Sequence, residues 1–180
     1  MVINEDNDMV DEKILFHGAL EEIKYPTDDR TTSKSTDFGD GFYLTELQSQ
    51  ANKWAISKRD KAIQHGWKDA KAIVNVYSLD RNKVLTNFKS KYFSKMNEEW
   101  LDFIIANRNH EEHLYDYVEG PMADDKIYNF VNDLLLGNIT RKDFWEKAMF
   151  KYPTHQVMIR NDAIYCLTFI ESYDVDDIDR

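Results

Sequence analysis

In the stretch Asp37-Phe38-Gly39-Asp40-Gly41-Phe42-Tyr43-Leu44-Thr45, two glycines punctuate a turn that runs directly into a short apolar strand. Residues then recur at helical spacing as far as Gly66, and a glycine commonly ends a helix. The recurring residues are Leu47, Ala51, Trp54, Ala55, Lys58 and Ala62. This part of the chain therefore predicts a strand that feeds a helix.

The rest of the chain alternates between short strands and helices in the same way. Before the turn, Lys13 to His17 is an apolar run that Gly18 closes, which is typical of a buried strand. Further strands are predicted over 72–79, 83–88, 114–119, 156–160 and 165–170, and further helices over 98–108, 124–136 and 140–152. The pattern predicts one α+β domain over residues 13–172, with an acidic flexible lead-in over 1–12 and an acidic tail over 173–180.

Composition and charge restrict the functional classes. The 180 residues are 42% apolar, and 23 basic against 33 acidic side chains give a net charge of −10. That charge argues against a broad non-specific hold on nucleic-acid phosphates or anionic lipid, although a local basic groove stays compatible with it. The sequence shows no secretory signal and no run of about 18 apolar residues, and its single Cys166 lies in a short apolar run. We therefore expect a soluble, cytoplasmic protein that binds no membrane.

Three features along the chain carry chemical interest. His17-Gly18 ends the first predicted strand, Tyr43 follows Gly41 in the next one, and Trp54 stands eleven residues after Tyr43 on the helix. Taken singly, aromatic residues at such positions usually pack in a core, and a lone histidine at a strand end usually lies on the surface. The order and spacing of the three features together are more specific than any one of them.

This set resembles the diphtheria-toxin-like branch of the ADP-ribosyltransferases, which includes the poly(ADP-ribose) polymerases and cleaves NAD with a His, a Tyr and usually a Glu. The chain from about Ile14 to Ile170 looks more closely like a bacterial family of otherwise unknown function assigned to that superfamily. The blocks of that family stand here in order as 15–18, 37–45 with Gln50, Ala51 and Trp54, then 116–125 and 155–157. The resemblance implies a split pair of mainly antiparallel β-sheets with flanking helices.

The resemblance also implies roles for individual residues, with NAD as the substrate. His17, Tyr43 and the third position of the motif would be catalytic, and His17, Gly18, Gly41, Tyr43 and Trp54 would bind NAD. In these relatives the histidine bonds ribose hydroxyls, the backbone after it pairs with the nicotinamide amide, and two aromatic rings enclose the nicotinamide. Trp54 stands where the relatives usually have Tyr.

The third catalytic position departs from the family, because the strand over 156–159 offers Gln156 where the relatives have Glu. A Gln oxygen accepts the ribose hydroxyl bond but brings no negative charge to the developing cation. Loss of such a group costs about 2–4 kcal/mol, or about 10²–10³ in rate, if nothing replaces it. Asp124 or Asp125 is a candidate for the missing carboxylate, and an amide on a plain sheet surface is the alternative interpretation of Gln156.

The function that the resemblance implies is transfer of ADP-ribose from NAD to a macromolecule, either a protein or a nucleic acid. Members of the family are similar to bacterial toxins, which implies the toxin of a toxin–antitoxin or phage-defence system with a small antitoxin protein as partner. Two alternatives stay open: a pseudoenzyme that binds a nucleotide or a protein, and an NAD glycohydrolase. The loop over 19–36, with Arg30, is long enough to be a lid over NAD.

A metal site is not expected. His110-Glu111-Glu112-His113 superficially suggests one, but its two histidines are three residues apart, whereas the zinc-protease helix needs a spacing of four. This stretch is better interpreted as a polar loop.

Overall fold

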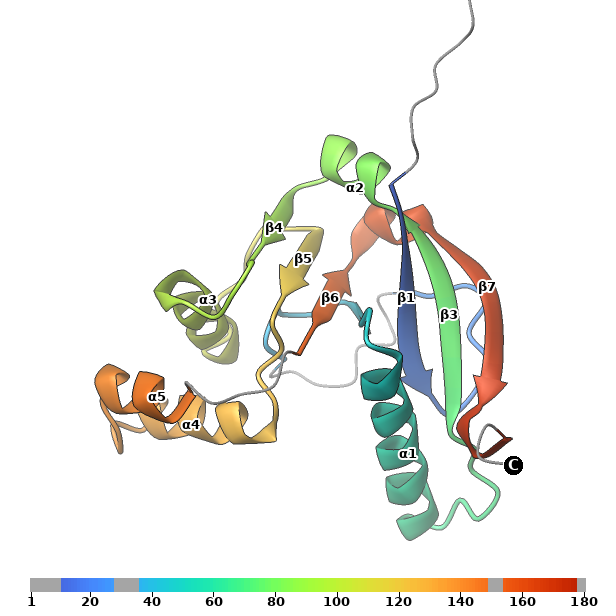
Figure 1. Cartoon of the computed structure of the whole chain (residues 1–180), viewed down its shortest axis with the longest axis horizontal. Helices are drawn as coiled ribbons and strands as arrows, with labels where there is room; N and C mark the ends of the chain where they lie inside the picture. Colours follow the sequence, from blue (N-terminus) through green and yellow to red (C-terminus); the bar gives the residue numbers. More distant parts are fainter. Residues whose placement is uncertain (1–10, 28–35, 149–153, 178–180) are drawn as a thin grey trace, which may run out of the picture.

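A computed structural model describes residues 11–27, 36–148 and 154–177 and contains two β-sheets with helices around them (Figure 1). Both sheets are built mainly from antiparallel strand pairs. The predicted α+β class, with mainly antiparallel sheets and flanking helices, is therefore confirmed. Within the described ranges, no helix is both long enough and apolar enough to span a bilayer.

The first sheet has three strands in the order β1 (Glu12–Ala19), β3 (Ile73–Asp80) and β7 (Leu167–Asp174). Both strand pairs are antiparallel, so β3 lies in the middle. The β-branched residues of β3 favour a strand in this central place, where most of its side chains are buried. Helix α1 (Gln48–Gln64) lies along β1 and covers one face of the sheet (Figure 1).

The second sheet has four strands in the order β2 (Phe42–Leu44), β6 (Gln156–Ile159), β5 (Tyr117–Gly120) and β4 (Ser90–Tyr92). The β4–β5 pair is parallel and the other two pairs are antiparallel. Because β6 lies between β2 and β5, strands that are far apart in the sequence become neighbours.

The two sheets meet where β1 passes the end of β2. The Phe16 N–H donates to the Thr45 carbonyl (2.7 Å), and the Thr45 N–H donates to the Phe16 carbonyl (2.9 Å). Buried side chains of both sheets form one core beside this bridge, among them Leu15, Phe42, Tyr77 and Ile159. Cys166 is buried in the same core, as its apolar surroundings in the sequence predict.

The remaining helices lie around the second sheet and at the ends of strands (Figure 1). They are α2 (Arg81–Asn87), α3 (Glu98–Arg108), α4 (Asp125–Leu135), α5 (Arg141–Ala148) and the 3-10 helices η2 (Asn161–Cys166) and η3 (Val175–Asp177).

Two helix starts predicted from polar residues are confirmed. The Asn97 side chain caps α3 by accepting a hydrogen bond from the Trp100 N–H (2.9 Å). At the start of α5, the Thr140 N–H donates to the Asp143 carboxylate (2.8 Å) and the Asp143 N–H donates to the Thr140 hydroxyl oxygen (3.2 Å). This reciprocal pair is a capping box.

The strand predicted over 83–88 is wrong, because these residues form most of α2 and its end. Asp80 caps this helix by accepting a hydrogen bond from the Lys83 N–H (2.9 Å). Val84 and Phe88 are four residues apart, so a helix turns both toward the core, where Val84 is fully buried. A short apolar run fits either the helical or the strand period, and here the cap favours the helix.

The ordered fold extends past the predicted domain end at residue 172. Strand β7 continues to Asp174, and the Val175 N–H then donates to the Ala72 carbonyl (2.8 Å). Val175 is buried in a small core cluster with alanines of α1. Residues 173–175 therefore belong to the packed domain rather than to a separate tail.

Candidate functional site

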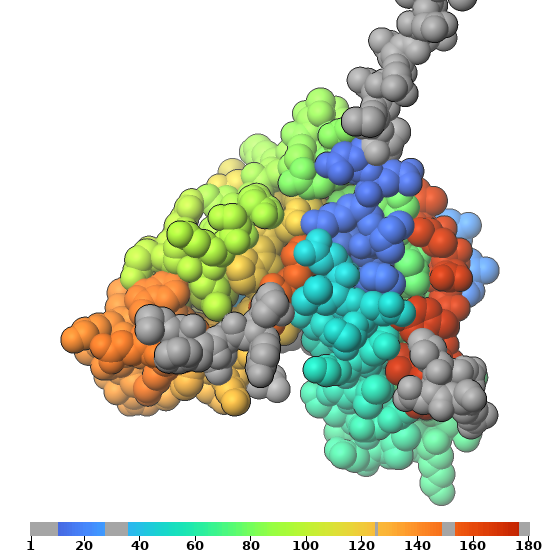
Figure 2. All heavy atoms as spheres, viewed as in Figure 1, coloured from blue at the N-terminus to red at the C-terminus, as the bar shows by residue number. Residues whose placement is uncertain are grey.

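A cavity of about 260 Å³ lies between α1 and the second sheet. Its walls include His17 at the end of β1, Tyr43 of β2, Trp54 of α1 and Gln156 at the start of β6. Segments that are more than a hundred residues apart in the sequence thus converge on one space. In the space-filling view, the surface is hollowed between α1 and the α4–α5 pair (Figure 2).

The His17 ring is fixed by two contacts. Its Nδ1 lies 2.6 Å from the Tyr43 carbonyl oxygen, and its ring stacks on Phe42 with centroids 4.3 Å apart. Because a carbonyl oxygen only accepts, Nδ1 carries the proton of the neutral ring, and Nε2 is then the unprotonated nitrogen. The ring orientation is therefore set before any ligand binds.

Tyr43 forms one wall of the cavity and is anchored through its hydroxyl. The hydroxyl donates to the Gly39 carbonyl (2.6 Å) and accepts from the Phe38 N–H (3.1 Å). Burial raises the pKa of Tyr43 well above its usual value, so the phenol stays protonated. Tyr43 can therefore offer a ring face to a ligand but is a poor proton donor.

Replacing Tyr43 with phenylalanine should lower the free energy of unfolding by about 1–2 kcal/mol, because the Phe38 N–H would lose its acceptor and the Gly39 carbonyl would keep only its bond from the Thr36 hydroxyl (2.6 Å). Urea denaturation measures this difference. Tyr165→Phe is the matched control, because that side chain is 79% exposed and its stability should not change. Equal stability of the two variants would contradict the anchoring role.

Gln156 is only 4% exposed, so its interpretation as an amide on a plain sheet surface is wrong. Its side chain borders the cavity and lies close enough to the Asp37 carboxylate to help lower the pKa of Asp37, but its Nε2 makes no hydrogen bond of ordinary geometry among the described residues. A buried donor without a partner costs free energy in the folded protein. A hydroxyl or carbonyl group of a ligand in the cavity would satisfy it.

The two glycines predicted to bind a ligand are explained first by packing. A Cβ on Gly18 would lie 2.5 Å from the Ala51 carbonyl oxygen, and one on Gly41 would lie 2.4 Å from Met158 Sδ. Gly41 borders the cavity, whereas Gly18 is buried under α1 and is not among the described lining residues. The Gly18 backbone was expected to pair with a nicotinamide amide, and its carbonyl already accepts a hydrogen bond from Lys58 Nζ (2.7 Å).

Asp37 is the carboxylate that lines the cavity, and the sequence did not single it out. Its Oδ1 lies 2.6 Å from the Arg108 guanidinium, and its Oδ2 accepts from the Ala123 N–H (3.0 Å). Burial raises the pKa of Asp37, and Arg108 opposes that rise. Because Arg108 already offsets its charge, Asp37 is a weak substitute for a catalytic glutamate.

The structure does not show Asp124 or Asp125, the two carboxylates expected from the sequence, in the position of the missing catalytic glutamate. The Asp124 side chain caps α4 by accepting from the Lys126 and Ile127 N–H groups (3.1 and 2.9 Å). The side chain of Asp125 lies outside the described residues, as do residues 28–35 of the predicted lid loop with Arg30.

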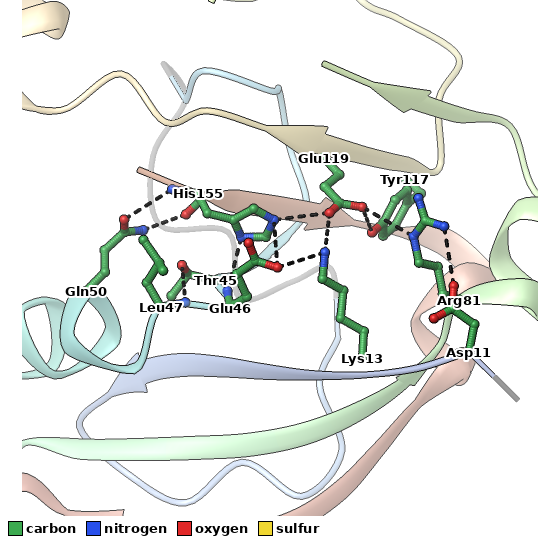
Figure 3. Close-up of polar contacts among 10 residues, drawn as sticks. All are labelled: Asp11, Lys13, Thr45, Glu46, Leu47, Gln50, Arg81, Tyr117, Glu119 and His155. Carbon is green, nitrogen blue, oxygen red and sulfur yellow. Dashed lines mark hydrogen bonds and ion pairs between the residues drawn. The ribbon is translucent and has the colours of Figure 1, made fainter. Parts of the chain in front are cut away.

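A buried charge network beside the cavity was missed by sequence reasoning (Figure 3). Glu119 of β5 is 3% exposed and bonds Lys13 of β1, His155 Nε2 (3.2 Å) and the Tyr117 hydroxyl (2.6 Å). Although burial alone would raise it, the bonds from His155, Lys13 and Tyr117 lower the pKa of Glu119 to about 2. The network therefore ties β1 of the first sheet to β5 and β6 of the second. Its one sequence signal is an acidic residue inside a buried strand.

The same network contains the group of the described residues that best matches a metal site. One ligand atom from each of Glu46, Glu119 and His155 lies within 4.8 Å of the others. However, Lys13 Nζ lies 2.9 Å from the Glu46 carboxylate and also bonds Glu119, so an ammonium group already holds the position of a cation.

The histidine pair near residue 110 forms a polar loop, as predicted. His113 Nε2 lies 2.8 Å from the Phe38 carbonyl oxygen, and burial lowers the pKa of this histidine. His110 is exposed in a left-handed conformation with φ of 62°.

Comparison with known proteins gives one match. The family model described as "Protein of unknown function (DUF3990)" matches residues 13–169, which is most of the chain. No curated protein and no solved structure matches.

Proposed function

The chain belongs to the DUF3990 family of proteins of unknown function, and from its cavity we propose that it is an NAD-dependent ADP-ribosyltransferase. It binds NAD with the nicotinamide in the cavity, breaks the bond between nicotinamide and ribose, and transfers ADP-ribose to a macromolecule. We further propose that it acts in the cytoplasm as a toxin, restrained by a small antitoxin protein.

The observation that carries the proposal is the convergence of four side chains on one cavity. His17, Tyr43, Trp54 and Gln156 come from four separate elements, and each occupies the position in the motif that the resemblance assigns to it. The aromatic walls suit a flat ring, and Gln156 Nε2, which makes no hydrogen bond of ordinary geometry among the described residues, suits a polar group such as a ribose hydroxyl. A cavity of about 260 Å³ is suited to the nicotinamide end of the ligand rather than to the whole dinucleotide.

The proposed reaction proceeds through a ribose with oxocarbenium character. The bond between C1′ and the nicotinamide nitrogen breaks, and nicotinamide leaves as a neutral molecule with the electron pair. His17 and Gln156 hold the ribose hydroxyls, while Tyr43 and Trp54 keep the leaving group in the orientation for departure. A nucleophile of the acceptor then bonds to C1′ and loses its proton. The net charge of −10 favours a protein as the acceptor over a nucleic acid.

Replacing Gln156 with glutamate should raise the rate of nicotinamide release by about 10- to 100-fold, because a carboxylate stabilises the developing positive charge. Release of labelled nicotinamide from NAD measures the rate. Gln156→Ala is the paired variant and should be slower than the parent, since it removes the hydrogen bond as well. A rate that falls in both variants would show that the amide itself is required.

The acceptor class is tested by incubating the purified protein with NAD labelled in the adenylate part in a cell lysate. Label in protein or in nucleic acid identifies a transferase and its acceptor class. Free labelled ADP-ribose with no labelled macromolecule identifies a glycohydrolase instead.

A pseudoenzyme is the second candidate, and two observations favour it. The cavity holds a glutamine in place of the catalytic glutamate, and Asp37, the acidic residue among the described residues of its lining, is paired with Arg108. A pseudoenzyme would bind NAD or a related nucleotide without releasing nicotinamide, which separates it from the enzyme in the same assay.

A further inference from the structure

One face of α1 carries four side chains that follow the cavity wall. Trp54, Lys58, Lys61 and His65 are spaced by four, three and four residues, which places them on one side of a helix. Trp54 and Lys58 border the 260 Å³ cavity, while Lys58, Lys61 and His65 border a second one of about 800 Å³. His17 and Lys58 line both, so the two cavities adjoin at these residues.

Lys58 is a half-buried cation with no carboxylate paired to it among the described residues. Its Nζ donates to the Gly18 carbonyl (2.7 Å), and within the described ranges it forms no ion pair. The chain has 33 acidic side chains, so the lack of an ion pair at Lys58 is not caused by a shortage of acidic residues. Partial burial beside the Gly18 carbonyl, with no carboxylate paired to the ammonium group, lowers the pKa of Lys58 to about 8. An anionic group beside it would offset the cost of this burial.

The second cavity adds the other features that a nucleotide requires. Lys61 brings a second ammonium group from the same helix face, and Trp67, just past the end of α1, borders the cavity with a ring that is 53% exposed. Lysines bind phosphates as point charges, and an exposed tryptophan offers a stacking surface for a base. The acidic residue in this lining is Glu21, at the opposite wall after β1.

We propose that the groove along α1 binds a nucleoside diphosphate, the ADP half of NAD, with Lys58 and Lys61 at the phosphates and Trp67 at the base. The identity of this ligand rests on the proposed function. A dinucleotide that spans both cavities would pass Lys58 at their junction, between the ring in the small cavity and the base in the large one.

ADP-ribose is the probe, since it lacks nicotinamide and fills only the groove and the ribose position. Lys58→Gln should weaken ADP-ribose binding at least about 10-fold in a calorimetric titration, because a charge-assisted hydrogen bond to phosphate is lost. Trp67→Ala should also weaken it, and this exposed position keeps the test valid if the Lys58 variant does not fold. Lys53→Gln is the matched control, since Lys53 is an exposed lysine of α1 outside both linings.

The pH dependence gives an independent readout. Between pH 7 and 9.5 the parent protein should lose affinity for ADP-ribose as Lys58 loses its proton near pH 8, whereas the Lys58→Gln variant should not. The other titratable groups that line the two cavities with Lys58 are His17, Glu21, Asp37, Tyr43, Lys61, His65 and Tyr128. The Lys58→Gln variant keeps all of them, so a pH dependence that it lacks belongs to Lys58.

The groove and the proposed function can fail separately. If ADP-ribose binding depends on Lys58 but the protein releases no nicotinamide, the nucleotide-binding groove is supported and the proposed enzyme activity is contradicted. If the parent and Lys58→Gln both release nicotinamide with the same KM for NAD, the proposed enzyme activity is supported and the role of the groove in binding NAD is contradicted. The groove is also overturned if ADP-ribose does not bind, or if a single-stranded oligonucleotide binds through Lys58 while ADP-ribose does not.

Discussion

Replacing His17 with alanine is expected to lower the rate of nicotinamide release from NAD by about 100- to 1,000-fold. The His17 ring is already oriented by the Tyr43 carbonyl and the Phe42 ring, so in the proposed reaction its Nε2 would meet the ribose without a rearrangement. Alanine removes this group and leaves the ribose hydroxyl without its partner. The measurement is release of labelled nicotinamide under conditions where the parent enzyme turns over many times.

The control for this variant is His110→Asn. His110 is exposed, and asparagine tolerates its left-handed backbone, so neither the fold nor the rate should change. A thermal melt of both variants separates a lost chemical group from a lost fold. A His17→Ala protein that is folded and releases nicotinamide at the parent rate would contradict the proposed function.

Replacing Glu119 with alanine is expected to lower the free energy of unfolding by about 3–5 kcal/mol at neutral pH. The change removes the buried carboxylate that Lys13, His155 and the Tyr117 hydroxyl share, and it leaves them only the more exposed Glu46 carboxylate, 2.9 Å from Lys13 Nζ (Figure 3). Removing one member of a buried charge network costs more than the network contributes, because the remaining buried groups lose their partner. Guanidinium denaturation measures the difference.

The control is Glu146→Ala, because Glu146 and its partner Lys142 are 64% and 85% exposed and 3.9 Å apart. That variant should lose no more than about 0.5 kcal/mol. The double variant with Lys13→Met should recover part of the loss caused by Glu119→Ala, since it removes a cation that has lost its buried partner. Full additivity of the two changes would contradict a coupled network.

The same carboxylate predicts a pH dependence of stability. Its pKa is about 2 in the folded protein against a usual value of 4.5, so the folded state holds the proton less tightly than the unfolded state. The contribution of Glu119 is therefore complete above about pH 4.5 and is lost as the pH falls toward about 2. The parent protein should lose more stability across this window than Glu119→Ala does.

What the sequence could and could not predict follows from the range over which each feature acts. Local signals were sufficient for the caps at Asn97 and Thr140, because a cap involves only the next few residues. The choice between helix and strand at Val84 and Phe88 was also local. The structure resolves it through the Asp80 cap, but in the sequence Asp80 is equally typical of a turn.

Long-range features were beyond single-sequence reasoning. Lys13 and Glu119 are 106 residues apart, and nothing in their own segments indicates that they meet. Lys58 falls on the predicted helix, but its burial depends on the backbone contact of that helix with Gly18. The four residues of the proposed site could be grouped only because their order and spacing resemble a known motif, not from any property of each one alone.

The place of β6 in the second sheet has a consequence for biosynthesis. This strand is the shared partner of β2 and β5, yet it is made from residues 156–159. During translation, β2 and β5 leave the ribosome with no strand between them, and Gln156 is still to come. The cavity, whose lining includes Gln156, is therefore complete only after synthesis has passed β6, and the activity proposed for it would arise only at that point.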